Sequence, residues 1–259
     1  MMRLLESCKL CPRNCNINRL DGKAGYCGAD GNLRIARAAL HFWEEPCLSG
    51  EAGSGTVFFS HCSLKCIYCQ NYNISQNGFG KNISISRLSE IFLELQDQKA
   101  NNINLVTPTH FVPHIVQAIE LSKGSGLNIP IVYNSSGYET VETIRLLKGY
   151  VDVYLPDLKY YDDKYAAGYS NAPGYFKSAS AAIEEMSHQV GEAAFNEKGI
   201  IQKGLIIRHL MLPGMLFDSK KIIDHIYRTF GHSVYVSLMN QYTPMYRVKD
   251  NIQLSKALN

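Results

Sequence analysis

Six short apolar or β-branched runs are separated by segments with helical spacing, and this alternation restricts the fold more than any other feature. The runs are continuous rather than alternating, which is typical of parallel strands covered on both faces. Between them, residues 88–95 and 141–147 carry apolar side chains at helical spacing. We expect strands at residues 56–59, 103–106, 129–133, 151–155, 205–210 and 234–238.

Alternating strands and helices with connections of this length predict an α/β fold with a parallel sheet and right-handed crossovers. Periodicity alone leaves a doubly wound sheet and a barrel open. A chain of 259 residues with 46% hydrophobic content suffices for one large domain. In such folds ligands bind at the carboxyl ends of the strands, so the polar loops that follow the strands are expected to line one site.

All eight cysteines lie before residue 70, and this asymmetry divides the chain. We expect a cysteine-rich, metal-binding segment with little regular structure at residues 1–50, the main domain at 51–246 and a polar tail at 247–259. No apolar stretch is long enough for a signal peptide or a membrane span, which predicts a cytoplasmic protein without a membrane partner. In that reducing compartment, cysteines favour metal ligation over disulfides.

Charge argues against nucleic acid as a partner, since 26 Lys and Arg residues face 23 Asp and Glu residues without a basic run. A zinc-dependent nucleic-acid-binding module, which would need a basic and aromatic surface, is therefore disfavoured.

Three cysteines follow the first predicted strand with the spacing Cys62-x3-Cys66-x2-Cys69. Three thiolates on a four-iron cubane leave one iron open for an outside ligand, whereas a structural zinc site is normally closed by four ligands. A zinc site completed by His61 or Cys47, or simply buried reduced thiols, are the alternatives. The spacing favours an iron–sulfur cluster.

The stretch reads Cys-Ser-Leu-Lys-Cys-Ile-Tyr-Cys, with Tyr68 just before the last cysteine, and resembles the signature of the radical S-adenosylmethionine (SAM) superfamily. The resemblance runs from about residue 54 to 244 and implies a partial (β/α)6 TIM-like barrel with a small cysteine-rich N-terminal cap. It implies a [4Fe-4S] cluster that binds SAM, with Tyr68 near the adenine, and reductive cleavage of SAM to a 5′-deoxyadenosyl radical that abstracts hydrogen from a substrate. A low-potential electron donor such as flavodoxin or ferredoxin would be required.

Strand-end residues are similar to those of glycyl-radical-enzyme activating proteins such as pyruvate formate-lyase activating enzyme. These residues are Asp157 and Lys159 after the fourth strand, Arg208 before Pro213-Gly214, and the segment from Asn134 through Ser136 to Gly137. The resemblance implies that Asn134, Ser136, Asp157 and Lys159 contact SAM and that Arg208 lies near the substrate or the SAM carboxylate. For Asp157 and Lys159 a surface ion pair is the alternative.

One segment departs from the superfamily pattern: Thr107-Pro108-Thr109-His110 stands where most members carry a Gly-Gly-Glu type sequence. Thr107 or Thr109 would then supply the missing side-chain acceptor for SAM. Together with the N-terminal cysteines, this departure indicates an outlying, activating-enzyme-like branch. Its substrate would be a glycyl-radical enzyme or another peptide, nucleotide or metabolite, and an open-sided barrel suits a protein loop. A non-catalytic electron-transfer protein is the rival reading.

Four more cysteines, Cys8, Cys11, Cys15 and Cys27, precede the main domain. Four thiols can close a site, so an auxiliary iron–sulfur cluster, a zinc ion and free or redox-active thiols all remain open. Cys47 is interpreted as a small buried residue.

Two weaker patterns involve neighbouring side chains. His110 and His114 would share a helix face, as metal ligands often do, or His110 would contact the substrate. Glu44 and Glu45 are adjacent and project differently, which argues against a cooperating carboxylate pair.

Overall fold

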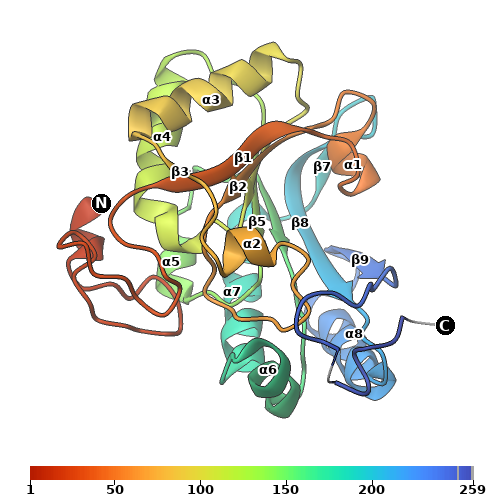
Figure 1. Cartoon of the computed structure of the whole chain (residues 1–259). Coiled ribbons are helices and arrows are strands. Elements are labelled where there is room, and N and C mark those ends of the chain that lie inside the picture. Colours follow the sequence, from red (N-terminus) through yellow and green to blue (C-terminus); the bar gives the residue numbers. More distant parts are fainter. Residues whose placement is uncertain (250, 258–259) are drawn as a thin grey trace.

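A nine-stranded sheet forms the centre of the protein in this computed structural model, which describes residues 1–249 and 251–257 (Figure 1). Six strands run parallel in the order β2-β4-β5-β6-β8-β9. All six expected strands are present, and the α/β fold with a mostly parallel sheet is confirmed. These strands are β2 (Ser54–Phe59), β4 (Ile103–Val106), β5 (Ile131–Ser135), β6 (Val153–Pro156), β8 (Ile201–Leu210) and β9 (Tyr235–Met239).

Three antiparallel strands were not predicted: β1 (Arg34–His41), β3 (Lys81–Asn82) and β7 (Ala194–Phe195). The expectation of little regular structure in residues 1–50 was wrong for β1, which pairs with β2 from Ile35 to His41. Its sequence is rich in Ala and Arg, so side-chain composition gives only a weak strand signal. Pairing with the neighbouring strand therefore decides its structure.

The sheet is an open, partial barrel. In the described part of the chain β9 pairs with β8 alone, while β3 ends the sheet on the other side. The side chains of Tyr235, Val236 and Leu238 on β9 are exposed. One side of the barrel is thus open to solvent.

Helices cover the outer face of the sheet (Figure 1). Ser84 caps the first long helix by accepting a hydrogen bond from the Arg87 backbone amide, and the predicted apolar side chains Leu88 and Phe92 are buried. The long helices are α3 (Ile85–Asp97), α4 (Val112–Gly124), α7 (Tyr175–Val190) and α8 (Leu216–Phe230). The shorter ones are η1 (Met2–Leu5), α2 (Tyr72–Ser75), η2 (Thr109–Phe111), α5 (Val141–Arg145) and α6 (Asp163–Ser170).

A second, smaller core lies inside the partial barrel, toward the amino ends of the strands. Side chains alternate along each strand, so Tyr133 and Tyr154 pack in the core that includes the helices, whereas Val132 and Leu155 pack with Leu48. Leu48 belongs to α1 (Pro46–Ser49), and its carbonyl accepts a hydrogen bond from Asn102 Nδ2 at 2.9 Å, just before β4 begins. Helix α1 therefore closes the inside of the barrel at the amino ends of the strands.

The segment predicted as a polar tail has two buried side chains, Val248 and Leu254. The Arg247 amide donates to the Ile67 carbonyl at 2.9 Å, and Tyr242 Oη donates to the Leu254 carbonyl at 2.7 Å. Residues 250 and 258–259 of this segment lie outside the described residues. No helix in the described ranges is long and apolar enough to cross a membrane.

Candidate active site

The loop at residues 60–70, here called the cysteine loop, follows β2 directly and carries Cys62, Cys66 and Cys69. It lies at the carboxyl end of the strand, where a parallel sheet places its ligands. Each of the three sulfurs accepts or shares a hydrogen bond, which suits a thiolate bound to metal. The partners are the Leu64 amide at 3.4 Å from Cys62, Ser170 Oγ at 2.9 Å from Cys66 and Ser75 Oγ at 3.2 Å from Cys69.

Burial and a nearby cation act in opposite directions on these thiols. Burial raises the pKa of Cys66 to about 11, while the Lys159 ammonium opposes that rise. Burial also raises the pKa of Cys62, with a further contribution from Cys66. The free thiols of Cys62 and Cys66 are thus neutral at pH 7, and forming thiolates at these two positions requires a bound cation such as a metal centre.

Asp157, Lys159 and Arg208 meet near Cys66 of this loop, in line with their resemblance to residues of activating enzymes. Asp157 Oδ2 lies 2.5 Å from Lys159 Nζ, and its Oδ1 lies 2.9 Å from Arg208 Nε. Asp157 and Lys159 thus form an ion pair, as the alternative had it, but the three side chains are only 15–17% exposed, so the pair does not lie on the surface. Burial acts to raise the pKa of Asp157, but Arg208 and Lys159 outweigh it and hold that pKa below its ordinary value.

Glu44 and Asn104, which were not predicted as site residues, complete this polar network. Arg208 donates to Asn134 Oδ1 at 2.7 Å and to Glu44 Oε1 at 3.2 Å. Asn104 Nδ2 in turn donates to Glu44 Oε2 at 2.7 Å. Glu44 lies between the end of β1 and the start of α1, so this connection brings a carboxylate into the barrel from the side of the amino ends of the strands. Burial raises the pKa of Glu44, and Arg208 opposes this.

The remaining predicted residues surround the strand ends. Tyr68 is buried with its hydroxyl 2.6 Å from Tyr160 Oη. Thr107 follows β4 with a φ of 58°, a costly conformation for a β-branched residue, which is often found at functional sites. The Ser136 carbonyl accepts a hydrogen bond from Tyr175 Oη at 2.7 Å.

Thr109 is buried, and its Oγ1 donates to Glu139 Oε1 at 2.6 Å. Glu139 was not predicted as a site residue. Burial raises its pKa to about 8, against which hydrogen bonds from Thr109 and Ser135 act. The Thr109 hydroxyl is thus already engaged by a protein carboxyl group.

His110 and His114 do not converge on one point. His110 Nε2 lies 2.7 Å from the Ser60 carbonyl, and His114 Nε2 lies 3.0 Å from the Gly31 carbonyl. Both side chains are buried, and burial lowers the pKa of His110 to about 3 and that of His114 to about 4. The expectation that they share a metal is wrong, because each ring contacts a different backbone carbonyl.

The N-terminal cap, defined here as residues 1–33, brings its four cysteines within electrostatic reach of one another. Burial, with contributions from Cys27 and Cys8, raises the pKa of the Cys11 thiol to about 12. Burial likewise raises the pKa of Cys27, to which Cys8 and Cys15 contribute. No three Cys, His, Asp or Glu side chains in residues 1–249 and 251–257 are arranged to hold one metal ion.

Arg19 lies fully buried beside these thiols. Its guanidinium donates to the carbonyls of Asp30 at 2.7 Å and His110 at 2.6 Å, and it lies 3.8 Å from Cys8 Sγ. None of the ion pairs in the described part of the chain includes Arg19. A buried cation is costly unless an anion compensates it.

The cap is packed on the cysteine loop. Arg13 Nε donates to the Ser63 carbonyl at 2.9 Å, and its guanidinium stacks 3.7 Å from the centre of the Tyr26 ring. The Arg13 guanidinium also donates a hydrogen bond to the Asn171 carbonyl. Since residue 63 lies between two of the loop cysteines, the two cysteine groups are held next to each other.

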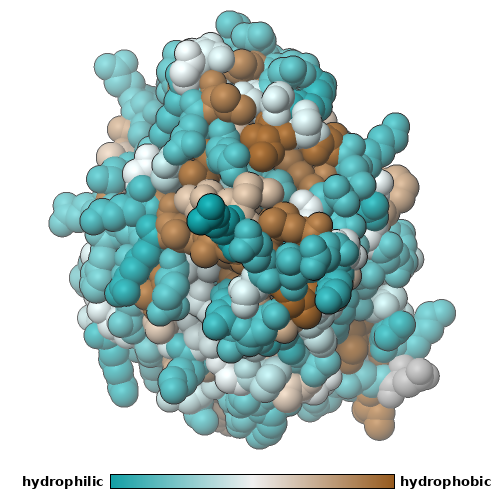
Figure 2. All heavy atoms as spheres, turned by 90° about the vertical axis from the view of Figure 1, so that its left-hand side faces the viewer, coloured by the Kyte–Doolittle hydropathy of each residue, from teal (hydrophilic) through white to brown (hydrophobic). Residues whose placement is uncertain are grey.

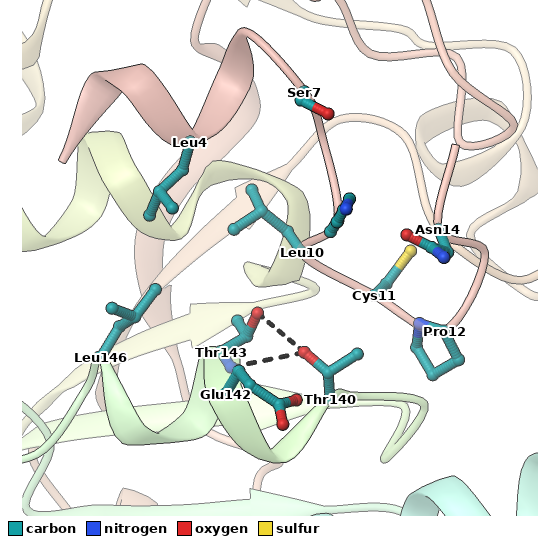
Figure 3. A pocket seen from close by; sticks show the side chains of 11 residues that line it. Leu4, Ser7, Leu10, Cys11, Pro12, Asn14, Thr140, Glu142, Thr143 and Leu146 are labelled. Carbon is teal, nitrogen blue, oxygen red and sulfur yellow. Dashed lines mark hydrogen bonds between the residues drawn. The ribbon is translucent and has the colours of Figure 1, made fainter. Parts of the chain in front are cut away.

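A pocket of about 570 Å³ separates the cap from helix α5 (Figure 3). Leu4, Leu10 and Leu146 supply apolar walls, and Cys11 contributes to its lining. It opens on the side of the molecule that carries the cap, where apolar groups are surrounded by a mostly hydrophilic surface (Figure 2). Cys11 of the cap, which is half-buried, thus borders a pocket at the surface.

Comparison with known proteins assigns this arrangement to a family. The sequence model of the Radical SAM superfamily matches residues 56–224. The uncharacterized protein MJ0674 of Methanocaldococcus jannaschii is 32% identical over 265 residues, which cover 98% of this chain and 71% of that protein.

The chain belongs to the radical SAM superfamily. Solved structures similar to it include native anSMEcpe with bound AdoMet, at 12% identity over 70% of this chain with a TM-score of 0.47. The FeFe-hydrogenase maturase HydG from Carboxydothermus hydrogenoformans is 15% identical over 69% of this chain, with a TM-score of 0.49. The chain spans about half the length of these two proteins, 51% and 42% respectively.

As a radical SAM protein, the chain is a radical enzyme that uses a [4Fe-4S] cluster and SAM. The cysteine loop fits that cofactor, since three thiols with donors at each sulfur leave one iron of a cubane open. A cubane binds each thiolate through a different iron, so its ligands need not surround a single point.

Proposed function

We propose that this radical SAM enzyme abstracts hydrogen from a protein substrate, and that its target is a glycyl residue in a loop of a glycyl-radical enzyme. The observation that carries the proposal is the network of Asp157, Lys159 and Arg208 beside Cys66 in a barrel with one open side. The similarity of these residues to activating enzymes supports the substrate class, and the open side would admit a polypeptide loop.

A [4Fe-4S] cluster held by Cys62, Cys66 and Cys69 would bind the methionyl group of SAM and supply the electron that breaks a carbon–sulfur bond. SAM, one electron and a substrate C–H bond then give methionine, 5′-deoxyadenosine and a substrate radical. Asp157 fixes Lys159 so that its positive charge lies near the Cys66 thiolate. We propose that flavodoxin or ferredoxin delivers the electron.

For SAM we propose contacts with Tyr68, Thr107, Asn134, Ser136, Asp157 and Lys159. Their shared position at the carboxyl ends of β4, β5 and β6 and on the cysteine loop supports this set. Thr107 is preferred over Thr109 as the acceptor that replaces the missing glutamate, because the Thr109 hydroxyl is engaged by Glu139.

For Cys8, Cys11, Cys15 and Cys27 we propose a second metal centre, an iron–sulfur cluster or zinc. No three of these described side chains converge on one point as a zinc ion would need, which favours the cluster. Four thiolates give either centre a net negative charge, and buried Arg19 beside Cys8 would be its counter-ion. The metal content distinguishes the two: about eight irons per chain indicate a second cluster, and about four irons with one zinc indicate zinc.

Anaerobic reconstitution with iron and sulfide, followed by dithionite and SAM, tests the enzymatic proposal. The wild-type protein is expected to form 5′-deoxyadenosine, and an EPR-detectable glycyl radical should form in the cognate glycyl-radical enzyme. A reducible cluster that leaves SAM intact would contradict the proposal and favour an electron-transfer protein. SAM cleavage with radical formation only on a peptide, nucleotide or metabolite would contradict the glycyl target.

A further inference from the structure

The polar network inside the barrel contains one carboxylate that the basic side chains do not neutralise. Glu45 stands directly before α1, and its Oε2 atom is buried without a hydrogen-bond partner among the residues that the structure describes. None of the ion pairs formed by residues 1–249 and 251–257 includes Glu45. Its charge nevertheless acts on both Glu44 and Arg208, so it belongs to the same group.

Asn104 contributes a second unsatisfied acceptor. The residue is fully buried, and its Nδ2 donates to Glu44 at 2.7 Å. Within the described part of the chain, its Oδ1 atom has no hydrogen-bond partner. Reversing the amide would set that oxygen against the Glu44 carboxylate, so the hydrogen bond fixes which atom is unpaired. Leaving a buried acceptor unpaired is unfavourable, and a donor from outside the chain would relieve it.

The charges around these atoms favour a cation. Arg208 and Lys159 are two cations, whereas Asp157, Glu44 and Glu45 are three carboxylates. Asp157 and Glu44 are already paired with those cations, which leaves the carboxylate of Glu45 in excess. His41 also lies close enough to act electrostatically on Glu44. The Arg208 and Glu44 side chains remain 15% and 13% exposed, so solvent reaches the network.

We propose that the barrel interior beside Glu44, Glu45 and Asn104 binds a positively charged alkylammonium or alkylguanidinium group of the substrate. Such groups carry several N–H donors and no acceptor, which complements two unpaired acceptors and an excess carboxylate. A carboxylate or phosphate group of a substrate would be repelled there. This inference rests on the proposed function, because it takes the barrel interior as the substrate site.

Trp43 gives a direct readout. It is the only tryptophan of the chain, it is 89% exposed and it precedes Glu44. The reconstituted protein is titrated with N-acetylarginine amide and N-acetyllysine amide while Trp43 fluorescence is followed. N-acetylcitrulline amide, which is neutral and nearly the same shape as the arginine probe, is the matched ligand control. Calorimetry measures the same affinities independently of fluorescence.

Glu45→Gln is the principal variant because it removes the charge while keeping the shape, and Glu44→Gln is the second. Glu51→Gln is the control, since Glu51 is an exposed carboxylate that follows α1. At least one cationic probe is expected to bind saturably to the wild type and Glu51→Gln. Binding should be at least about tenfold weaker in Glu45→Gln, and citrulline should not bind.

The inference is overturned if neither cationic probe binds, if citrulline binds equally well, or if both Gln variants bind the cations like the wild type. Assaying 5′-deoxyadenosine in the same wild-type preparation keeps the two proposals separate. A preparation that cleaves SAM but binds no cation refutes only the cation site. One that binds the cation but does not cleave SAM refutes only the proposed function.

Discussion

The two cysteine groups lie side by side but are built differently. The cysteine loop presents three thiols at the carboxyl end of β2, and its nearby cation, Lys159, is itself paired with Asp157. The cap presents four thiols, and its nearby cation, Arg19, is buried against backbone carbonyls without a carboxylate. The charge of Lys159 is neutralised by a carboxylate of the protein, whereas Arg19 requires an anion, which the cap thiols can provide as thiolates.

This difference agrees with the proposal of a reactive centre in the cysteine loop and a closed one in the cap. Three ligands and a paired lysine suit a cluster with an exchangeable position for SAM, while four thiols, two of them near a buried arginine, suit a centre with none. The contact of Arg13 with the Ser63 carbonyl holds the two regions together, so a change in one can be measured at the other.

The largest expected effect is on catalysis. Cys66→Ala should lower 5′-deoxyadenosine formation at least about 1000-fold, because a radical SAM cluster cannot be held without its ligand. Cys11→Ala should retain dithionite-driven cleavage in its folded fraction, since dithionite reduces the loop cluster without the cap.

Cys47→Ala, which removes a half-buried thiol outside both groups, should remain near wild-type activity. The distinction between the two regions fails if Cys11→Ala is as inactive as Cys66→Ala.

The next effect concerns Glu139, which is buried beside Thr109 and acts electrostatically on Cys11. Burial raises its folded-state pKa to about 8 from an ordinary 4.5, so its neutral form is favoured. Its stabilising contribution is present below about pH 4.5 and is lost as pH rises through 8. Glu139→Gln should therefore unfold less readily than the wild type at pH 9, by about 4 kcal/mol.

Chemical denaturation at pH 5, 7 and 9 measures this difference. Equal pH dependence in Glu139→Gln and the wild type would show that Glu139 is ionised in the folded protein.

A somewhat smaller effect tests the counter-ion role of Arg19. Arg19→Met should destabilise the metal-loaded protein by about 3 kcal/mol, because it leaves an anionic thiolate centre without its buried cation. In metal-free protein the same change should cost less, since no carboxylate there depends on the guanidinium. Denaturation with and without metal gives both values, and Arg3→Met serves as the control because Arg3 is exposed.

If Arg19→Met costs the same in both forms, Arg19 has a packing role and the proposal of a counter-ion is wrong.

The smallest expected effect is a shift in reduction potential, which would show which of the two proposed clusters is held by the cysteine loop. Ser170→Ala removes the hydroxyl that donates to Cys66 at 2.9 Å, which should lower the reduction potential of the loop cluster by about 60 mV. The potential of a cap cluster should not change. A redox titration followed by EPR measures both, and an unchanged loop potential would contradict the role of this hydrogen bond.

The sequence predicted the parallel strands well because their apolar runs are continuous, and those of β2, β4, β5 and β6 are buried on both faces. It missed β1, whose Ala and Arg residues carry no strand signal and whose structure depends on pairing with β2. The openness of the barrel depends on β9, which pairs only with β8 among the described strands, and local sequence does not encode such an arrangement.

At the site, Asp157, Lys159, Arg208 and Asn134 were predicted from the resemblance to activating enzymes, and the structure brings them together. Glu44 was missed because it comes from a segment outside the repeated units, about 90 residues before Asn134. Asn104 left a detectable signal, a polar residue inside the apolar run Ile103–Val106. Glu139 showed none, because its pKa results from burial that only the fold creates.

The most direct test is EPR spectroscopy of the reconstituted, dithionite-reduced protein with and without SAM, in the wild type and Cys66→Ala. We predict that SAM changes the spectrum of one [4Fe-4S] cluster in the wild type and that this SAM-sensitive signal is absent from Cys66→Ala. A cluster signal that persists in Cys66→Ala and still responds to SAM would contradict the assignment of SAM chemistry to the cysteine loop.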